Sequence, residues 1–411
     1  MTAIDSETLD ANDALAHLRD AFALPAGKTY LDGNSLGALP QAVVERVDAT
    51  VRGQWGDDLI ASWNRHDWIG LPARVGEKIA PLVGAAPGQV ICCDSISVNL
   101  FKLLATALKL QPGRPVIVSE AGNFPTDLYM VEGLRELLGA ERCELRAVPR
   151  DGLVEALGDD VAVLMLTQVN FRTGEMHDMV RLTRAAHDAG ALVLWDLAHS
   201  TGVLPVALDD CGVDMAVGCG YKFLNGGPGA PAFLYLARAL QGKVQQPLTG
   251  WMGHRRAFDF VPGYEAAAGI EHYLSGTPGI LGMAALDEAL SLFDGLDLHA
   301  VRAKSLALTE MFMTGVAAAP VLSAFRCLTP GDPQRRGSQV SLAHEQGYAI
   351  AQALIEDGIV VDFRAPDIVR FGFAPMYNSF ADVSRALAAL TEVMVSERYR
   401  ESRFAERALV T

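Results

Sequence analysis

The segment that decides the fold runs from Val161 to Asp196 and reads VAVLMLTQVNFRTGEMHDMVRLTRAAHDAGALVLWD. Its two ends are short, almost wholly apolar runs that are typical of buried strands. Between them, Asp178 stands at the N-cap position and Gly190 at the C′ position of a short helix. A strand, a helix and a second strand in this order predict parallel pairing in a sheet whose two faces are both covered. The sequence therefore predicts an α/β fold.

Further strand candidates with the same buried pattern flank this segment. They are residues 115–120, 142–148 and 214–219. In parallel sheets of this kind, ligands bind at the carboxyl ends of the strands. We therefore look for functional side chains directly after each strand candidate.

The C-terminal part of the chain has a different pattern, in which Ala- and Leu-rich helices alternate with short strand candidates. Helices are expected at residues 286–293, 301–316, 348–357 and 383–398, and strands at 339–342, 359–362 and 368–372. This is an α+β pattern. The expected organisation has three parts: an N-terminal segment (1–50) that packs on the small domain, a large α/β domain (51–290) and a small C-terminal α+β domain (291–411).

The composition limits the classes of partner. With 34 Lys and Arg against 49 Asp and Glu in 411 residues, the formal net charge is −15. Such a surface repels nucleic acid phosphates and anionic lipid headgroups. The N-terminus carries Asp5 where a signal peptide has basic residues, and no apolar run is long enough to span a bilayer. We expect a soluble, cytoplasmic protein that binds neither nucleic acid nor membranes.

The six cysteines show neither a C-x-x-C pair nor a nearby His at zinc-ligand spacing. Neither a disulfide framework nor a metal site is therefore predicted. The adjacent Cys92 and Cys93 leave a strained vicinal disulfide open, although two small buried side chains are the favoured interpretation. We expect reduced thiols, which agrees with a cytosolic location.

Two strand ends deliver polar side chains to the same edge of the sheet. Asp196 ends one strand and is followed three residues later by His199. Taken alone, this pair is explained equally well by an Asp that caps a turn and a core His. After the next strand, Tyr221 and Lys222 precede a Gly-Gly-Pro-Gly turn at residues 226–229. A lone lysine at a strand end usually extends to the surface, but these apolar, Gly-rich surroundings favour a desolvated amine, the condition for a Schiff-base lysine.

Asp196 and Lys222 lie 26 residues apart, at the ends of neighbouring strands. An Asp and a Lys placed in this way have a specific use in pyridoxal phosphate chemistry. The carboxylate of Asp196 keeps the pyridine nitrogen protonated, and the amine of Lys222 holds the aldehyde as an imine. Ser95 and Ser97 offer a phosphate site at the start of an apolar helix expected at residues 98–110, although plain N-capping explains them too. Phe124 follows another strand and either stacks on a pyridine ring or is an ordinary core aromatic.

Motifs spread along most of the chain point to one family. They are GNSLG (33–37), SVNLFK (97–102), FPTD (124–127), WDLAHS (195–200), GYKFLNGGPG (220–229), GWMGH (250–254), SGTP (275–278) and RFGFAPMYNSF (370–380). Each motif alone is weak evidence, but their order and spacing together are highly specific. The chain resembles the kynureninase family of pyridoxal phosphate-dependent enzymes, which have fold type I (aspartate aminotransferase-like). The resemblance implies a large, mostly parallel sheet domain, a smaller C-terminal α+β domain and pyridoxal 5′-phosphate as cofactor.

The resemblance also implies a role for each matching residue. Lys222 resembles the lysine that binds the cofactor and moves the Cα proton, Tyr221 a tyrosine that contacts phosphate and takes part in acid–base steps, and Asp196 the partner of the pyridine nitrogen. The implied cofactor-binding residues are Ile96, Ser97, Phe124, Pro125, Thr126, Asp127, Thr167, Asp196, His199, Tyr221, Lys222, Trp251 and Thr277. The last two would reach the phosphate from the other subunit of a homodimer.

Three residues are implied or offered for substrate binding. Arg370 resembles the arginine that holds the α-carboxylate of the amino acid, a bidentate contact that Lys makes poorly. Asn34 lies in a matching motif, and Trp63 is a candidate for the aryl pocket, although surface packing explains Trp63 equally well. The implied reaction is the hydrolysis of L-kynurenine to anthranilate and L-alanine in tryptophan catabolism and NAD biosynthesis. 3-Hydroxy-L-kynurenine stays open as a second substrate.

Alternatives with the same fold are a cysteine desulfurase, an aminotransferase and a catalytically inactive homologue. A desulfurase needs a mobile, reactive Cys about a hundred residues beyond the lysine, and Cys327 lies 105 residues after Lys222. However, the sequence around Cys327 predicts a strand, and Tyr221 stands where desulfurases have His. The inactive homologue is disfavoured because the lysine, the aspartate, the tyrosine and Arg370 are all present.

Overall fold

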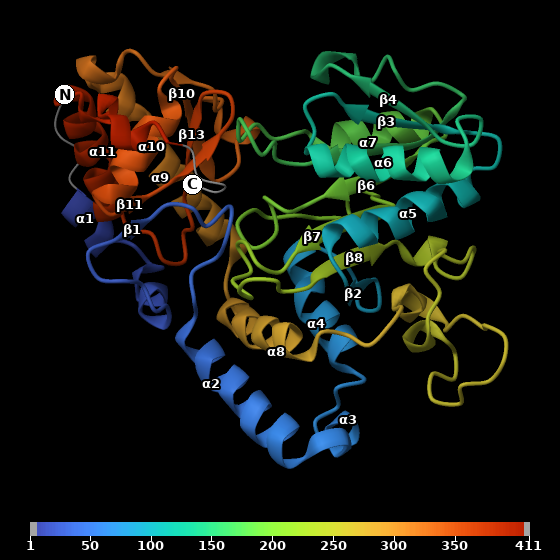
Figure 1. Ribbon diagram of the computed structural model, residues 1–411. Coiled ribbons are helices and arrows are strands. Elements are labelled where there is room, and N and C mark those ends of the chain that lie inside the picture. The colour runs from blue at the N-terminus through green and yellow to red at the C-terminus, as the bar shows by residue number, and fades with distance from the viewer. Residues whose placement is uncertain (1–5, 407–411) are drawn as a thin grey trace.

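The computed structural model describes residues 6–406, which are arranged around one large sheet and one smaller sheet (Figure 1). Residues 1–5, on which the expectation about export rests in part, lie outside this range. The large sheet has seven strands in the order β2-β8-β7-β6-β5-β3-β4. These are β2 (Val90–Cys92), β3 (Val116–Glu120), β4 (Glu144–Val148), β5 (Val161–Thr167), β6 (Leu192–Asp196), β7 (Met215–Cys219) and β8 (Ala232–Leu236).

Strands β3 to β7 pair in parallel, whereas β8 runs antiparallel to both of its neighbours. The predicted α/β class with a mostly parallel sheet is thus confirmed. The sequence pattern misses β2 and β8. β2 has only three residues, and β8 lies within a long charge-free stretch (223–237) that has no clear periodicity.

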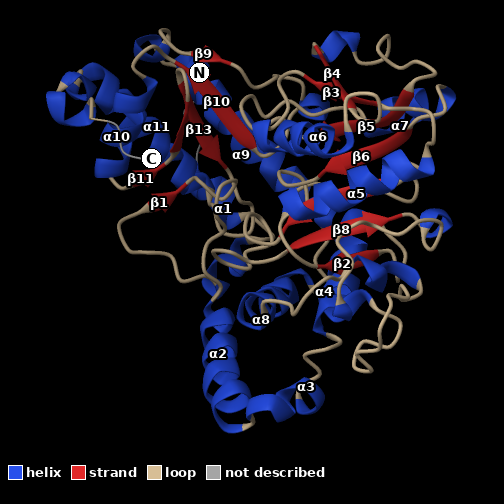
Figure 2. Cartoon of the chain, turned by 45° about the vertical axis from the view of Figure 1, so that its right-hand side comes forward, coloured by secondary structure: helices blue, strands red, loops and turns tan. Residues whose placement is uncertain are grey.

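Helices cover both faces of this sheet (Figure 2). Successive side chains of a strand point to opposite faces, so each strand contributes to two cores. On β5, Leu164 and Leu166 enter one hydrophobic core, and Val163 and Met165 enter the other. The first core includes side chains from α4 (Leu71–Ile79), α7 (Met179–Asp188) and α8 (Ile280–Ala289); the second includes side chains from α5 (Ile96–Leu110) and α6 (Pro125–Leu138).

The predicted capping of the central helix is observed. The Asp178 side chain accepts from the Arg181 N–H at 3.0 Å, and Gly190 has a φ of +74°, which suits glycine. Another helix differs from its prediction: residues 286–293 continue a helix that begins earlier, at Ile280, and its last turn (Leu290–Phe293) is a 3-10 helix.

The C-terminal part forms a four-stranded antiparallel sheet in the order β12-β13-β10-β9. Its strands are β9 (Arg326–Cys327), β10 (Gln339–Ala343), β12 (Asp362–Arg364) and β13 (Ile368–Gly372); its helices are α9 (Leu298–Ala318), α10 (Gly347–Glu356) and α11 (Phe380–Val395). The single strand expected at 359–362 is instead two strands, because β11 (Ile359–Val360) leaves this sheet and pairs in parallel with β1 (Thr29–Tyr30).

The N-terminal segment is anchored to the small sheet and its helices. Besides the β1–β11 pair, helix α1 (Ser6–Ala11) lies beside α11 (Figure 1), where Asp10 accepts from the Phe380 and Ala381 N–H groups at 2.7 and 2.9 Å. The chain then turns through α2 (Gln41–Ala49) and α3 (Ser62–Arg65) toward the large sheet. Val43 of α2 packs with Ala285 and Ala289 of α8 in the large domain. The domain division at residues 50 and 290 remains a proposal.

Three further observations concern residues 6–406 alone. No helix combines the length and apolar character needed to cross a bilayer. No group of three or more His, Cys, Asp or Glu side chains is arranged to hold a metal ion. All six cysteines are free, and Cys92 and Cys93 are both buried.

Candidate active site

A cavity of about 360 Å³ lies where the carboxyl ends of β5, β6 and β7 meet the N-termini of α5 and α6. Ten of the thirteen predicted cofactor-binding residues line it: Ile96, Ser97, Phe124, Thr126, Asp127, Thr167, Asp196, His199, Tyr221 and Lys222. The rule that ligands bind at the carboxyl edge of a parallel sheet therefore points to a cavity that these residues share. A larger cavity, near 610 Å³, lies between the C-terminal ends of α5 and α6, far along these helices from the polar cluster.

Lys222, His199 and Asp196 form the centre of the cavity. The Nζ of Lys222 lies 3.0 Å from Nε2 of His199. Burial, and then the charge of Lys222, hold the pKa of His199 well below its usual range, so the imidazole is neutral and accepts from the ammonium. Asp196 ends β6, where its Oδ1 accepts from the Ala198 N–H at 2.7 Å.

A second carboxyl group, Asp127, lies near Asp196, and Thr167 connects the two. The Thr167 hydroxyl is 3.2 Å from Asp127 Oδ2 and 3.5 Å from Asp196 Oδ2. Burial raises the pKa of both carboxyl groups, and the charge of Asp196 further raises that of Asp127, well above its usual range. Of the two groups, Asp127 is the one whose pKa is raised further, because the charge of Asp196 adds to the effect of burial.

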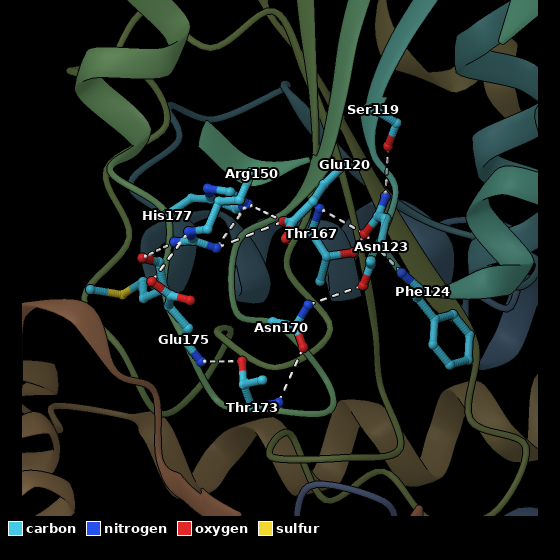
Figure 3. A network of polar contacts seen from close by, with 12 residues as sticks. Ser119, Glu120, Asn123, Phe124, Arg150, Thr167, Asn170, Thr173, Glu175 and His177 are labelled. Atoms are coloured by element: carbon cyan, nitrogen blue, oxygen red, sulfur yellow. Dashed lines mark hydrogen bonds and ion pairs between the residues drawn. The ribbon is translucent and has the colours of Figure 1, made fainter. Parts of the chain in front are cut away.

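Asn123 holds Thr167 in place, and Figure 3 shows the two residues together with Ser119 and Phe124. Its Oδ1 accepts from the Thr167 N–H at 3.3 Å and from the Phe124 N–H at 2.9 Å, and its Nδ2 donates to Ser119 at 3.1 Å. The sequence reasoning does not identify Asn123. Its position, three residues after the end of β3, is the signal that would have found it, because the other polar residues of the site also follow strand ends.

Two aromatic rings meet at the rim of the cavity. Phe124 is 39% exposed, and its ring packs edge-to-face on Phe171, with centroids 5.1 Å apart and an interplanar angle of 84°. An exposed aromatic face beside a buried carboxylate pair is suited to stacking on a flat ligand. Phe171 is absent from the predicted site, because it lies in the irregular segment between β5 and α7, where no sequence pattern marks it.

The mouth of α5 forms the other end of the cavity. Ser95 is the N-cap, and its hydroxyl accepts from the Val98 N–H at 3.4 Å. The helix begins at Ile96, two residues before the predicted start, so Ile96 and Ser97 belong to its first turn. Their backbone N–H groups have no partner within the helix and therefore favour an anion.

Tyr221 and the N-terminal motif shape the loop that carries the lysine. Burial, and then the neighbouring Cys219 and Asp196, raise the pKa of Tyr221, so its hydroxyl remains a donor. The Gly37 N–H donates to the Tyr221 carbonyl at 2.8 Å, and a Cβ on Gly37 would clash with the carbonyl oxygen of Lys222. Only glycine allows this approach, which explains the GNSLG motif.

Arg370 lies just behind the cavity and does not line it. It is 1% exposed, and its Nη2 donates to Asp362 at 2.6 Å and to Ser35 at 3.1 Å. Its Nη1 donates at 2.6 Å to the carbonyl of Phe171, which does line the cavity. The buried Nε has no partner, so the guanidinium keeps a free donor at this atom.

The structure does not bring the other predicted residues to this cavity. Asn34 is buried beside Gln339, 3.4 Å from its side chain, and its Oδ1 has no partner. Trp63 packs edge-to-face on Trp251 with centroids 5.9 Å apart, and Thr277 is exposed. Pro125 is the first residue of α6 and does not line the cavity.

The residues present fit pyridoxal phosphate. The two buried carboxyl groups have Lys222 as their nearby cation, and Asp196, which ends β6 beside it, would stabilise a protonated ring nitrogen. An amine for the aldehyde, an aromatic face for the ring and a helix N-terminus for the phosphate surround the same cavity. With this fold, these features define a pyridoxal phosphate-dependent enzyme of fold type I.

Comparison with known proteins supports this class and identifies the family within it. A kynureninase from Burkholderia pseudomallei (strain 1106a) is 49% identical over 409 residues, 98% of each chain, and one from Pseudomonas fluorescens is 46% identical over 412 residues, 99% of each chain. The family model of the kynureninase C-terminal domain matches residues 301–390. The chain belongs to the kynureninase family.

Solved structures with the same fold are more distant in sequence. A C-DES mutant with glycine covalently linked to its pyridoxal phosphate cofactor superposes with a TM-score of 0.79 at 20% identity, covering 91% of this chain and 99% of that one. The cysteine desulfurase CsdA from Escherichia coli gives 0.77 at 24% identity, covering 93% and 98%. This likeness concerns the fold alone. Cys327 lies in strand β9, as the sequence predicts, so the desulfurase alternative is not favoured.

Proposed function

We propose that this chain hydrolyses L-kynurenine to anthranilate and L-alanine at the cavity around Lys222. The observation that carries the proposal is the Lys222–His199 contact beside the carboxyl pair, in a chain that matches kynureninases along nearly its whole length. The cofactor, when bound, supplies an electron-withdrawing ring that stabilises the negative charge released when substrate bonds break. The side chains of this chain supply binding and proton transfer.

Each side chain at the centre of the cavity has a proposed task. Lys222 would hold the cofactor through its aldehyde carbon, and its free amine would remove the proton from the substrate Cα. Neutral His199 orients the amine by accepting from it. Asp196 would keep the ring nitrogen protonated, and Asp127, whose pKa is raised further, would act as the neutral member of the pair. Tyr221 is the proposed donor when a proton is returned.

The substrate's carboxylate is proposed to bind Arg370. The guanidinium is held by Asp362, Ser35 and the Phe171 carbonyl. A substrate carboxylate that replaces one of these contacts would leave the other two in place. The bond to Phe171 joins this arginine to the ring that packs on Phe124. We therefore expect binding of the substrate carboxylate at Arg370 to influence the position of the Phe124 ring.

We also propose a homodimer in the cytoplasm. Trp251 and Thr277, which the family resemblance assigns to the cofactor phosphate, do not line the cavity of their own chain. A second copy is the source that would complete the site with these residues. Exposed aromatic rings of the same segment, Phe258 and Phe260, support this interface because such rings are seldom left in water.

The proposed activity is tested by adding L-kynurenine to the purified, cofactor-loaded chain. We expect anthranilate, measured by its fluorescence, and L-alanine in equal amount. 3-Hydroxy-L-kynurenine in a parallel reaction gives the preference between the two substrates. Release of sulfide from cysteine without anthranilate would refute the proposal and favour a desulfurase.

The role of Arg370 is tested by Arg370→Lys, which keeps the charge facing Asp362 but loses the planar fork. We expect KM to rise about 10- to 100-fold, since a hydrogen bond to a charged group contributes about 1.5–3 kcal/mol, and kcat to change less. Arg364→Lys is the matched control, because Arg364 also pairs with Asp362, at 2.8 Å, but from the partly exposed side. An unchanged KM for Arg370→Lys would exclude the carboxylate contact.

A further inference from the structure

Lys102 is a buried charge that the proposed mechanism does not use. Its side chain is 0% exposed, although lysine is almost never fully buried unless it is paired. The Nζ donates to Asp94 Oδ2 at 2.6 Å and to the carbonyl oxygen of Tyr273 at 2.5 Å. Lys102 lies in the second turn of α5, and its side chain extends back toward the start of that helix.

Asp94 places a negative charge at the mouth of α5. It directly precedes the N-cap Ser95 and lines the cavity together with Ile96 and Ser97. Its side chain is 31% exposed. Its φ of +51° lies in the left-handed region, which Asp and Asn tolerate better than other residues with a Cβ. Without a counter-charge, this carboxylate would repel an anion at the helix N-terminus.

We propose that Lys102 is a positioning residue for cofactor binding: from inside the protein it neutralises Asp94, and this keeps the mouth of α5 favourable for the cofactor's phosphate. Lys102 does not line the cavity, so it acts through Asp94. Tyr273 fixes the ammonium from the other side, and its own hydroxyl is 2.9 Å from Thr106, one turn further along α5. The inference rests on the proposed function, because it takes pyridoxal phosphate as the ligand.

The experiment compares two probes, pyridoxal phosphate and pyridoxal, which share the ring and aldehyde but differ in the phosphate. Each is titrated into the full-length, cofactor-stripped chain, and Kd is read from absorbance. We expect Lys102→Met to weaken pyridoxal phosphate about 10- to 100-fold, because a bare carboxylate then faces the phosphate. Pyridoxal should change less than about threefold, since it carries no charge at that position.

The double variant Lys102→Met/Asp94→Asn should restore the affinity for pyridoxal phosphate to within about threefold of the unmodified chain, because the unpaired carboxylate is gone. Lys109→Met is the matched control on the same helix: its Nζ also donates to a carbonyl, that of Gln245 at 2.8 Å, but from the surface. It should alter neither Kd. Asp94→Asn alone should bind pyridoxal phosphate at least as tightly as the unmodified chain, which keeps the test decisive if Lys102→Met does not fold.

Three results would overturn the inference. Equal weakening of both probes by Lys102→Met would assign Lys102 a purely structural role. A double variant as weak as the single one would show that Asp94 does not mediate the effect. Weaker pyridoxal phosphate binding by Asp94→Asn would show that its carboxylate supports the phosphate. Kynurenine turnover by the unmodified chain is measured separately. If the chain binds the cofactor but releases no anthranilate, the proposed function is refuted. The ratio of the two Kd values still decides this inference.

Discussion

Replacement of Lys222 by alanine is expected to lower the rate of kynurenine hydrolysis about 10⁴-fold or more. The variant loses the amine that binds the cofactor covalently and the base that moves the Cα proton, and a positioned acid–base group alone contributes about 10²–10⁴-fold. His199 cannot replace it, because burial holds the pKa of its imidazole low and a weak base cannot take over the role of the amine.

The measurement combines steady-state turnover with borohydride reduction and mass spectrometry. In the unmodified chain, reduction should add one cofactor to the peptide that contains Lys222 and abolish its absorbance band. Lys222→Ala should show no adduct. Lys222→Arg keeps a cation beside His199 without a usable amine and should be equally inactive, whereas Lys243→Ala removes an exposed lysine and should behave as the unmodified chain. An adduct on another lysine, or turnover above about 1% in Lys222→Ala, would contradict the assignment.

Local sequence chemistry accounts for the centre of the fold. The unbroken apolar runs of β5 and β6, with Asp178 and Gly190 capping the helix between them, specify a strand–helix–strand unit without help from distant residues. Where the pattern fails, tertiary contacts decide. β8 pairs with β7, the strand before it, and also with β2, so its place depends in part on a strand that lies far away in the sequence. The division of the expected strand 359–362 into β11 and β12 likewise depends on β1, a segment more than 300 residues away.

The same division holds for the cavity. Asp196, Lys222 and Ser97 could be foreseen because each follows a strand or begins a helix, and that rule needs only local information. The burial of Arg370 behind Phe171 could not, because it depends on how the small sheet meets the segment between β5 and α7. The raised pKa of Asp127 is also a tertiary property, since it results from burial and from the neighbouring charge of Asp196.

The unequal rise in pKa gives the two carboxyl groups unequal expected effects. Asp196→Asn removes the group of the pair that more readily carries the negative charge, and breaking a buried ion pair costs about 3–5 kcal/mol. We therefore expect pyridoxal phosphate affinity or turnover to fall about 10²- to 10³-fold. Asp127→Asn replaces the carboxyl whose pKa is raised further with an amide of the same shape, which can donate to Asp196. Its expected effect is less than about tenfold.

The two variants are matched in size, burial and chemistry, so each is the control for the other. Kd from absorbance titration, kcat with L-kynurenine and the pH dependence of the cofactor band separate binding from ring protonation: in Asp196→Asn the band should lose the form in which the ring nitrogen is protonated, whereas in Asp127→Asn it should keep that form. Equal losses in both variants would mean that the charge is shared evenly. A larger loss in Asp127→Asn would place the ionised partner of the ring at Asp127, on the first turn of α6, instead of at the end of β6.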